Sequence, residues 1–377
     1  MKKSVLVLTI LLLLSLVATT TAAAKGGPDK QPTWEQAFDP IPPMGEGANT
    51  WHGVEFKGNL YFVFWGTDNV DHVWGSPDGK SWSLAWKATD IQEGFEGIGT
   101  MFVFKNQLYL YLLDWEGELP AQVMRTPDGQ HWEAVASNEA TETYFTDFTE
   151  STSFQGALYL VNIYVGETSF ASRLWRSTSG DPGTWEEVVV FPDWDGVASF
   201  ASFKGALYAQ SNGVNIYNPS TLEWEMLPTQ ILRSYDGVSW EPVNTDGFGE
   251  PMNFMGGGLA AHKGYLYAGT GSLDVSGGDI WRSRDGLSWE PVTTDGFGRP
   301  ANLVMLGFAT YKGMLFSYSA GWEGIEVYAS KDGLHWNLTN EAGWGLGINR
   351  DHAQVVFKGS LYLGVIGPAG VMKLAKP

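Results

Sequence analysis

The stretch RSYDGVSWEPVNTDGFGEPMN at residues 233–253 returns forty-nine residues later as RSRDGLSWEPVTTDGFGRPAN at residues 282–302. Sixteen of the twenty-one positions are identical. Self-similarity at a fixed interval is the signature of a fold built by repeating one structural unit. The phrase is therefore either a duplicated active site or a structural joint that each unit needs.

The first half of the phrase contains the motif Ser/Thr-x-Asp-Gly-x-x-Trp, which occurs elsewhere in the chain. An Asp-Gly pair between two strand-like segments predicts a tight hairpin turn, because Gly accepts the positive φ that such turns need. The copies are SPDGKSW (76–82), TPDGQHW (126–132), SYDGVSW (234–240), SRDGLSW (283–289), SKDGLHW (330–336) and the degenerate STSGDPGTW (177–185).

A second motif, an aromatic or His residue with Lys-Gly and then Leu-Tyr, also predicts a hairpin turn. Its seven copies are spaced 48, 50, 49, 59, 49 and 46 residues apart. They are FKGNLY (56–61), FKNQLY (104–109), FQGALY (154–159), FKGALY (203–208), HKGYLY (262–267), YKGMLF (311–316) and FKGSLY (357–362).

The two turns divide each unit of about 50 residues into four strands, A to D, with the Lys-Gly turn between A and B and the Asp-Gly turn between C and D. The seventh unit lacks a fourth strand, whereas TWEQA (33–37) resembles strand-D segments such as SWEPV (288–292). An N-terminal strand that completes the last unit closes a ring with few exposed edges. We therefore predict an all-β fold, a seven-bladed β-propeller of four-stranded antiparallel blades, closed by the N-terminal strand.

The fourth interval is about ten residues longer than the others, and the surplus falls within GVNIYNPSTLEWEML (213–227). We predict an extended hairpin there between strands B and C. The predicted boundaries are a signal peptide at 1–24, a linker at 25–31 and one propeller at 32–377. Its blades are expected at about 46–86, 96–136, 146–191, 196–244, 254–293, 303–340, and 349–377 with 32–38.

The Ser/Thr-x-Asp-Gly-x-x-Trp turns resemble the Asp-box, the turn motif of sialidases and of the wider group of Asp-box (BNR) β-propellers, and the Leu-Tyr turns resemble kelch-type blades. The resemblance covers nearly the whole chain after residue 32. It implies the propeller fold, and folds of this kind carry many activities.

Bulk properties restrict the setting. Lys2 and Lys3 precede an apolar run, Val5 to Val17, which ends in small residues up to Ala24; this pattern is typical of a secretory signal peptide, with an uncleaved anchor as the alternative. The chain contains no Cys, so it has no disulfides and no thiolate metal site. A net charge of −19 disfavours nucleic acid as a partner. We expect a secreted monomer without a cofactor.

The residues that recur in every unit are interpreted as scaffold, because an enzyme normally needs one site. Each box Asp can accept hydrogen bonds from the backbone of its own turn, and each box Trp can pack between neighbouring blades. These residues are Asp78, Asp128, Asp236, Asp285 and Asp332, with Trp82, Trp132, Trp185, Trp240, Trp289 and Trp336.

Strand order places the A–B and C–D turns on one face, called here the box face. The D–A and B–C loops lie on the opposite face, called here the loop face, and function tends to reside on loops held by a rigid scaffold. Aromatic and acidic residues alternate there, a combination suited to sugars. The predicted ligand-binding residues are Trp51, His52, Trp115, Trp194, Asp195, Trp322 and Arg350; weaker catalytic candidates are Glu96, Asp147, Glu150, Asp351 and His352. His52 and His352 could alternatively be structural, a general base, or part of a metal site.

Three functions remain open at this level. The favoured one is a secreted, non-catalytic propeller that binds a glycan or cell-surface polymer on its loop face. The alternatives are a glycan-active hydrolase or lyase that uses carboxylates at the channel mouth, and a protein–protein platform with an extracellular protein ligand. Sialidase activity is disfavoured, because only Arg299 and Arg350 of the eight arginines fall in loop-face segments and an arginine triad cannot be assembled.

Overall fold

The computed structural model describes residues 33–39, 50–115, 119–137, 150–165, 170–218, 221, 223–272, 276–346, 350–366 and 370–375. Residues 32–377 form one compact unit. Within the described residues of this unit the structure is an all-β propeller of antiparallel sheets, with one short helix, α2 (Ala88–Ile91), and two 3-10 turns. None of the described helices is long and apolar enough to cross a membrane.

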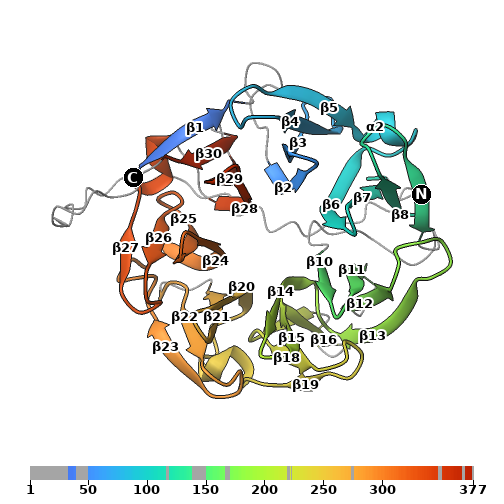
Figure 1. Ribbon diagram of the computed structural model, residues 1–377. Helices are drawn as coiled ribbons and strands as arrows, with labels where there is room; N and C mark the ends of the chain where they lie inside the picture. The colour runs from blue at the N-terminus through green and yellow to red at the C-terminus, as the bar shows by residue number, and fades with distance from the viewer. Residues whose placement is uncertain are drawn as a thin grey trace. The chain divides into compact units, whose positions relative to one another are not determined.

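Five sheets contain four strands each. Figure 1 shows them arranged around a common axis, with strand A of each unit nearest the centre. The sheets are β2 (Thr50–Phe56), β3 (Asn59–Trp65), β4 (Asp71–Ser76) and β5 (Ser83–Lys87); β6 (Gly97–Phe104), β7 (Gln107–Leu113), β8 (Gln122–Thr126) and β9 (Glu133–Ser137); β10 (Ser151–Phe154), β11 (Ala157–Val165), β12 (Phe170–Ser177) and β13 (Glu186–Pro192); β14 (Val197–Phe203), β15 (Ala206–Ser211), β18 (Ile231–Ser234) and β19 (Glu241–Pro242); and β28 (Arg350–Phe357), β29 (Ser360–Ile366), β30 (Val371–Leu374) and β1 (Trp34–Phe38).

The prediction of seven separate blades is wrong, because the strands of the fifth and sixth sequence units belong to a single eight-stranded sheet. Its strands are β20 (Met255–His262), β21 (Tyr265–Gly271), β22 (Ile280–Ser283), β23 (Trp289–Thr293), β24 (Asn302–Tyr311), β25 (Met314–Gly321), β26 (Val327–Ser330) and β27 (Trp336–Leu338). The strand pairing that joins the two halves consists of one residue pair, Gly271 with Val304.

Glycine explains why these two units join. A Cβ on Gly257 or Gly269 would lie 2.0 or 2.1 Å from the carbonyl oxygen of Met305, so only the bare backbone allows β24 to approach this closely. Gln210 connects the preceding unit to the same strands, since its side chain donates to Gly269 and accepts from the Gly258 amide. Sequence spacing alone counts turns and contains no sign of this contact.

The N-terminal strand lies where its sequence predicts, beside β30. Trp34 of β1 donates from Nε1 to the Thr339 hydroxyl at 3.0 Å, and its ring meets Trp344 edge-on at 5.8 Å. Glu35 lies 3.2 Å from the Lys373 ammonium. This strand therefore makes the cross-strand Arg/Lys–Glu contact that the second to fifth units make between strands C and D, such as Arg282 with Glu290.

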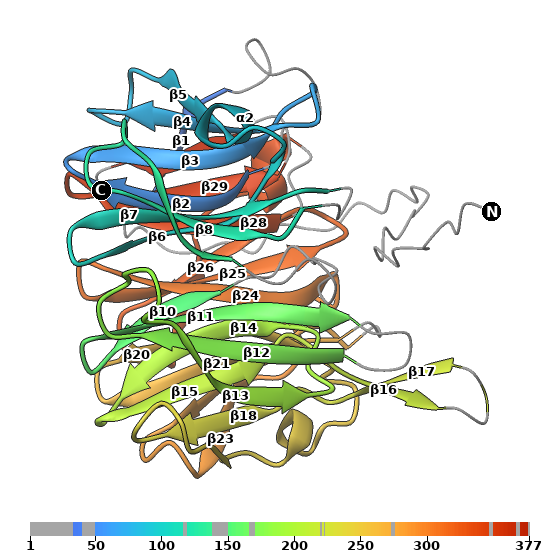
Figure 2. The same cartoon turned by 90° about the vertical axis from the view of Figure 1, so that its right-hand side faces the viewer.

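The extended hairpin in the fourth unit is present as predicted. Strands β16 (Val214–Asn218) and β17 (Glu223–Leu227) pair with one another and with no other strand in the described sheets. In Figure 2 this ribbon projects beyond the sheets on the side of the B–C loops.

The box turns have the predicted hydrogen bonds. In each of the five, one carboxylate oxygen of the Asp accepts from the amides two and three residues later; for Asp236 these distances are 2.8 Å to Val238 and 2.7 Å to Ser239. A hydrogen bond from the residue three positions later is the main reason why the pKa of all five carboxyls is lowered. At neutral pH these side chains are anionic caps of their own turns.

The Lys-Gly turn of one unit contacts the box turn of another, which explains why the two motifs occur together. The motif Tyr covers the box Gly: a Cβ on Gly286 would lie 2.0 Å from the Tyr208 hydroxyl, and one on Gly79 would lie 2.0 Å from that of Tyr362. The turn lysine adds a hydrogen bond, as from Lys204 to the Arg284 carbonyl. Both motifs are therefore parts of the joint between units.

Candidate functional site

The candidate site residues expected from the sequence lie on the loop face. The side chains of Trp51, Arg350, Asp351 and His352, and the whole of Asp147, lie outside the described residues. The polar cluster expected from the first and last units therefore stays a prediction. The other candidates can be located.

Trp194 is not available to a ligand, contrary to the prediction. It is 2 % exposed, its ring stacks on Phe191 at 4.7 Å, and its Nε1 donates to Gln230 at 3.0 Å. The backbone of Trp194 also bridges to Val214 at the base of the β16–β17 ribbon. An isolated Trp between two acidic residues looked exposed in sequence, but its ring belongs to the core of the third and fourth units.

Asp195 holds the β16–β17 ribbon through hydrogen bonds to its base. This structural role differs from the predicted role of Asp195 in ligand binding. Its carboxylate accepts from the Asn215 side chain at 2.8 Å and from Asn212 at 3.5 Å, while its amide donates to Gly213. Burial raises its pKa, and the hydrogen bond from Asn215 opposes this shift. The Asp-Trp-Asp segment is thus the anchor from which the extra hairpin projects.

An aromatic corner lies at the loop-face ends of the first two units; it consists of Trp65, Trp115, Glu96 and Gly97. The rings of Trp65 and Trp115 are 5.3 Å apart and inclined by 43°, and both are partly exposed. Trp115 lies over the bare Gly97, where a Cβ would be 2.5 Å from its Cζ2. Because the two rings come from different units, the junction itself fixes their angle.

Glu96 provides the polar group of this corner. It is partly exposed, but its Oε2 is shielded from water and has no hydrogen-bond partner. Its backbone is held firmly, since its carbonyl accepts from the Asp71 amide at 2.7 Å and its amide donates to Leu113. A shielded carboxylate oxygen without a partner is costly, and a ligand hydroxyl that donates to it removes that cost.

Two titratable groups, one basic and one acidic, lie on or directly before the inner strands next to the corner. Burial lowers the pKa of His52 in β2 to about 4, against its hydrogen bond with the Gly99 backbone, so the ring is neutral at pH 7. Desolvation raises the pKa of Glu150, directly before β10, to about 8, so its carboxyl is largely protonated at neutral pH. Strand β6, with Glu96 at its start, lies between β2 and β10. On this wall His52 and Glu150 are therefore largely uncharged hydrogen-bonding groups at neutral pH.

The B–C loop at residues 66–70 has its own charge network. Asp68 lies 3.0 Å from His72 and 2.8 Å from the Lys87 ammonium. Desolvation acts to raise the pKa of Asp68, but the hydrogen bonds from Lys87 and His72 outweigh it and lower the pKa to about 2. The Lys87 ammonium is thus already paired with the Asp68 carboxylate.

Trp322 is exposed as predicted, at 51 %. It stands beside Glu323, whose carboxylate lies 3.1 Å from Arg299, and the same guanidinium lies 3.0 Å from the buried Glu326. This is a single aromatic face next to a neutralised ion pair, on a different unit from the aromatic corner.

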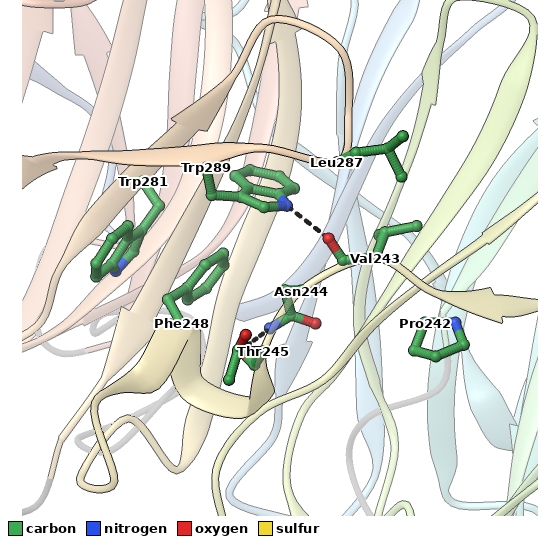
Figure 3. A pocket seen from close by; sticks show the side chains of 8 residues that line it. All are labelled: Pro242, Val243, Asn244, Thr245, Phe248, Trp281, Leu287 and Trp289. Atoms are coloured by element: carbon green, nitrogen blue, oxygen red, sulfur yellow. Dashed lines mark hydrogen bonds between the residues drawn. The ribbon is translucent and has the colours of Figure 1, made fainter.

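A cavity of about 450 Å³ lies between the fourth and fifth units and is lined by both halves of the repeated phrase. Figure 3 shows Phe248 between Trp281 and Trp289, with Trp289 Nε1 donating to the Val243 carbonyl. Phe248 stacks on Trp281 at 4.9 Å and meets Trp289 edge-on at 5.2 Å. The second half of the phrase is therefore part of the same joint as the first half.

Sequence reasoning missed Trp65, although a signal was present. In three units a Trp at the end of strand B or within two residues after it is followed by Gly within two residues: Trp65-Gly66, Trp115-Glu116-Gly117 and Trp322-Glu323-Gly324. Only the contact between the first two makes a corner. Within the described residues no group of three or more acidic or His side chains could hold a metal ion.

Comparison with known proteins supports the fold alone. No protein-family model matches the chain, and no curated protein matches it. A GH74 xyloglucanase from Xanthomonas campestris has a TM-score of 0.57 at 18 % identity, over 90 % of this chain and 53 % of that one. A catalytically inactive virginiamycin B lyase from Staphylococcus aureus, solved with quinupristin, has a TM-score of 0.60 at 10 % identity, over 88 % of this chain and 96 % of that one. The present chain thus spans about half of the xyloglucanase.

Proposed function

We propose that this chain is a secreted glycan-binding propeller that holds its ligand in the aromatic corner of the loop face. The observation that carries the proposal is the inclined pair Trp65–Trp115, together with an unpartnered carboxylate oxygen on Glu96, the residue before the Gly97 that Trp115 covers. Indole faces stack on the apolar C–H faces of pyranose rings, and a carboxylate accepts hydroxyl hydrogen bonds. The polysaccharide-degrading enzyme among the similar folds supports a glycan ligand as an analogy.

Binding without turnover is the favoured form of this function. The shielded Glu96 oxygen and the protonated Glu150 are the features that favour the second candidate, a hydrolase or lyase, because glycan cleavage uses a carboxylic acid with a raised pKa and a second carboxylate. The binding proposal rests on a contact between two units, whereas the catalytic one needs a separation between carboxylates that suits the reaction.

The test is retention of the purified chain by soluble polysaccharides in native affinity gels, with xyloglucan, galactomannan, hydroxyethyl cellulose and starch as probes. Trp115→Ala and Trp65→Ala are each expected to weaken retention by about tenfold or more, since one aromatic contact contributes on the order of 1–3 kcal/mol.

Tyr235→Ala is the matched control, because Tyr235 is an exposed aromatic (58 %) on the box face. Its loss should leave retention unchanged. Equal retention by all three variants would show that the corner is not the site. Release of reducing ends or unsaturated products from a retained polymer would establish the enzymatic alternative instead.

We also infer that β1 closes the propeller and that the box turns make the chain an Asp-box propeller with kelch-like turns. Trp34→Ala is expected to lower the free energy of unfolding by about 2 kcal/mol, since it removes a hydrogen bond to Thr339 and an aromatic contact with Trp344. Glu35→Ala, which removes only a surface ion pair, should cost below about 1 kcal/mol. Urea unfolding distinguishes them, and equal values for both variants would refute closure by this strand.

A further inference from the structure

Most arginines of this chain form ion pairs with carboxylates of the same chain. Six of the eight lie within 4 Å of a carboxylate of the same chain: Arg125 with Glu133 and Asp181, Arg173 with Glu187, Arg176 with Glu186, Arg233 with Glu241, Arg282 with Glu290, and Arg299 with Glu323 and Glu326. Five of these six join strands C and D or adjacent units. Arginine, the residue best suited to grip carboxylate, phosphate or sulfate, therefore serves here as a structural cross-link.

The loop face has few cations left for a ligand. Among its described side chains, Lys87 is held by Asp68 and Arg299 by two glutamates. His52 carries no charge at neutral pH. Exposed acids near the corner, Asp90 and Glu93, have the opposite sign. Among the described side chains of this face, an anionic ligand would meet a negative field without a compensating partner.

We propose that the ligand of the aromatic corner is an uncharged, hydroxyl-rich glycan, and that acidic polysaccharides are rejected. This inference rests on the proposed glycan binding and narrows it to a substrate class. A neutral pyranose ring suits the corner, because its C–H face can cover an indole while one hydroxyl donates to the shielded Oε2 of Glu96. A uronate, sulfate or phosphate group in the same place would put like charges together, which costs several kcal/mol in a partly desolvated site.

The net charge of −19 extends the same selection to long range. Like-charged macromolecules are held apart at low ionic strength, and salt removes this barrier because the Debye length falls from about 30 Å at 0.01 M to about 3 Å at 1 M. Selection against polyanions therefore has two parts: a local one at Glu96, which salt weakens little, and a general one, which salt removes.

The experiment compares each neutral polymer that the chain retains with its own carboxymethyl derivative, for example hydroxyethyl cellulose with carboxymethyl cellulose of equal length. At low salt (about 20 mM) the derivative is expected to be retained at least about tenfold less. At about 0.5 M salt the difference should shrink but persist. Glu96→Gln keeps the shape and removes the charge, so it should narrow the remaining difference at high salt; Glu186→Gln, an exposed carboxylate on the box face, should not.

Equal or stronger retention of the carboxymethyl derivative at low salt would overturn the inference and leave glycan binding intact. A difference that disappears completely at high salt and does not respond to Glu96→Gln would overturn the local part, because only the general charge would then be acting. Failure to retain any neutral polymer would remove the proposed function, and the inference with it.

Discussion

Replacing Gly257 by Ala should destabilise the propeller by about 3 kcal/mol or prevent its folding. The added Cβ would lie 2.0 Å from the carbonyl oxygen of Met305, a backbone atom that cannot rotate away. Relief requires β20 and β24 to separate, which also breaks the contact through Gly269 and the Gly271–Val304 pair. Urea unfolding followed by Trp fluorescence measures the loss.

Gly99→Ala is the matched control for this variant. Gly99 also lies in an innermost strand, but the nearest atom to its added Cβ is the Leu113 Cδ1 at 3.0 Å, the end of a side chain that can move. We expect a cost below about 1 kcal/mol. If the two variants unfold at the same urea concentration, close backbone approach is not what joins the fifth and sixth units.

Trp194→Ala should cost about 3–5 kcal/mol, as expected for emptying the place of a fully buried Trp. It removes the stack on Phe191 and the hydrogen bond to Gln230, and it leaves that amide oxygen without its partner. Trp322→Ala removes the same side chain from a site that is 51 % exposed and should change stability by no more than about 0.5 kcal/mol.

Thermal and urea unfolding of the two Trp variants therefore give opposite results for residues that look alike in sequence. Each lies in a short loop-face segment next to an acid and a Gly, Asp193-Trp194-Asp195-Gly196 and Trp322-Glu323-Gly324. A stable Trp194→Ala protein that has merely lost glycan retention would restore the original prediction that Trp194 binds the ligand.

The repeated phrase is a structural joint between neighbouring units. Its first half forms the box turn, and the Tyr of another unit covers the Gly of that turn. Its second half supplies Phe248, which lies between Trp281 and Trp289. Neither half of the phrase forms a single binding or catalytic site. The identity of the two copies follows from their shared packing role, because both halves contact the neighbouring unit.

The sequence by itself determined the strand order, both turn types, the extra hairpin at 213–227 and the pairing of the N-terminal strand with the last unit. Each of these depends on local chemistry: Gly at positive φ, Asp that caps its own turn, and alternation along a strand. Local signals of this kind recur once per unit, so repetition makes them readable.

Only the tertiary structure decided which loop aromatics face a ligand and which units merge. Burial of Trp194, the angle between Trp65 and Trp115, and the approach of Met305 to Gly257 and Gly269 all depend on contacts between residues 36 to 50 positions apart. A single sequence records the residue at each end of such a contact and not the distance between them. The joints could be predicted from the sequence because their motifs repeat. The aromatic corner occurs once among the described residues and forms where two units meet.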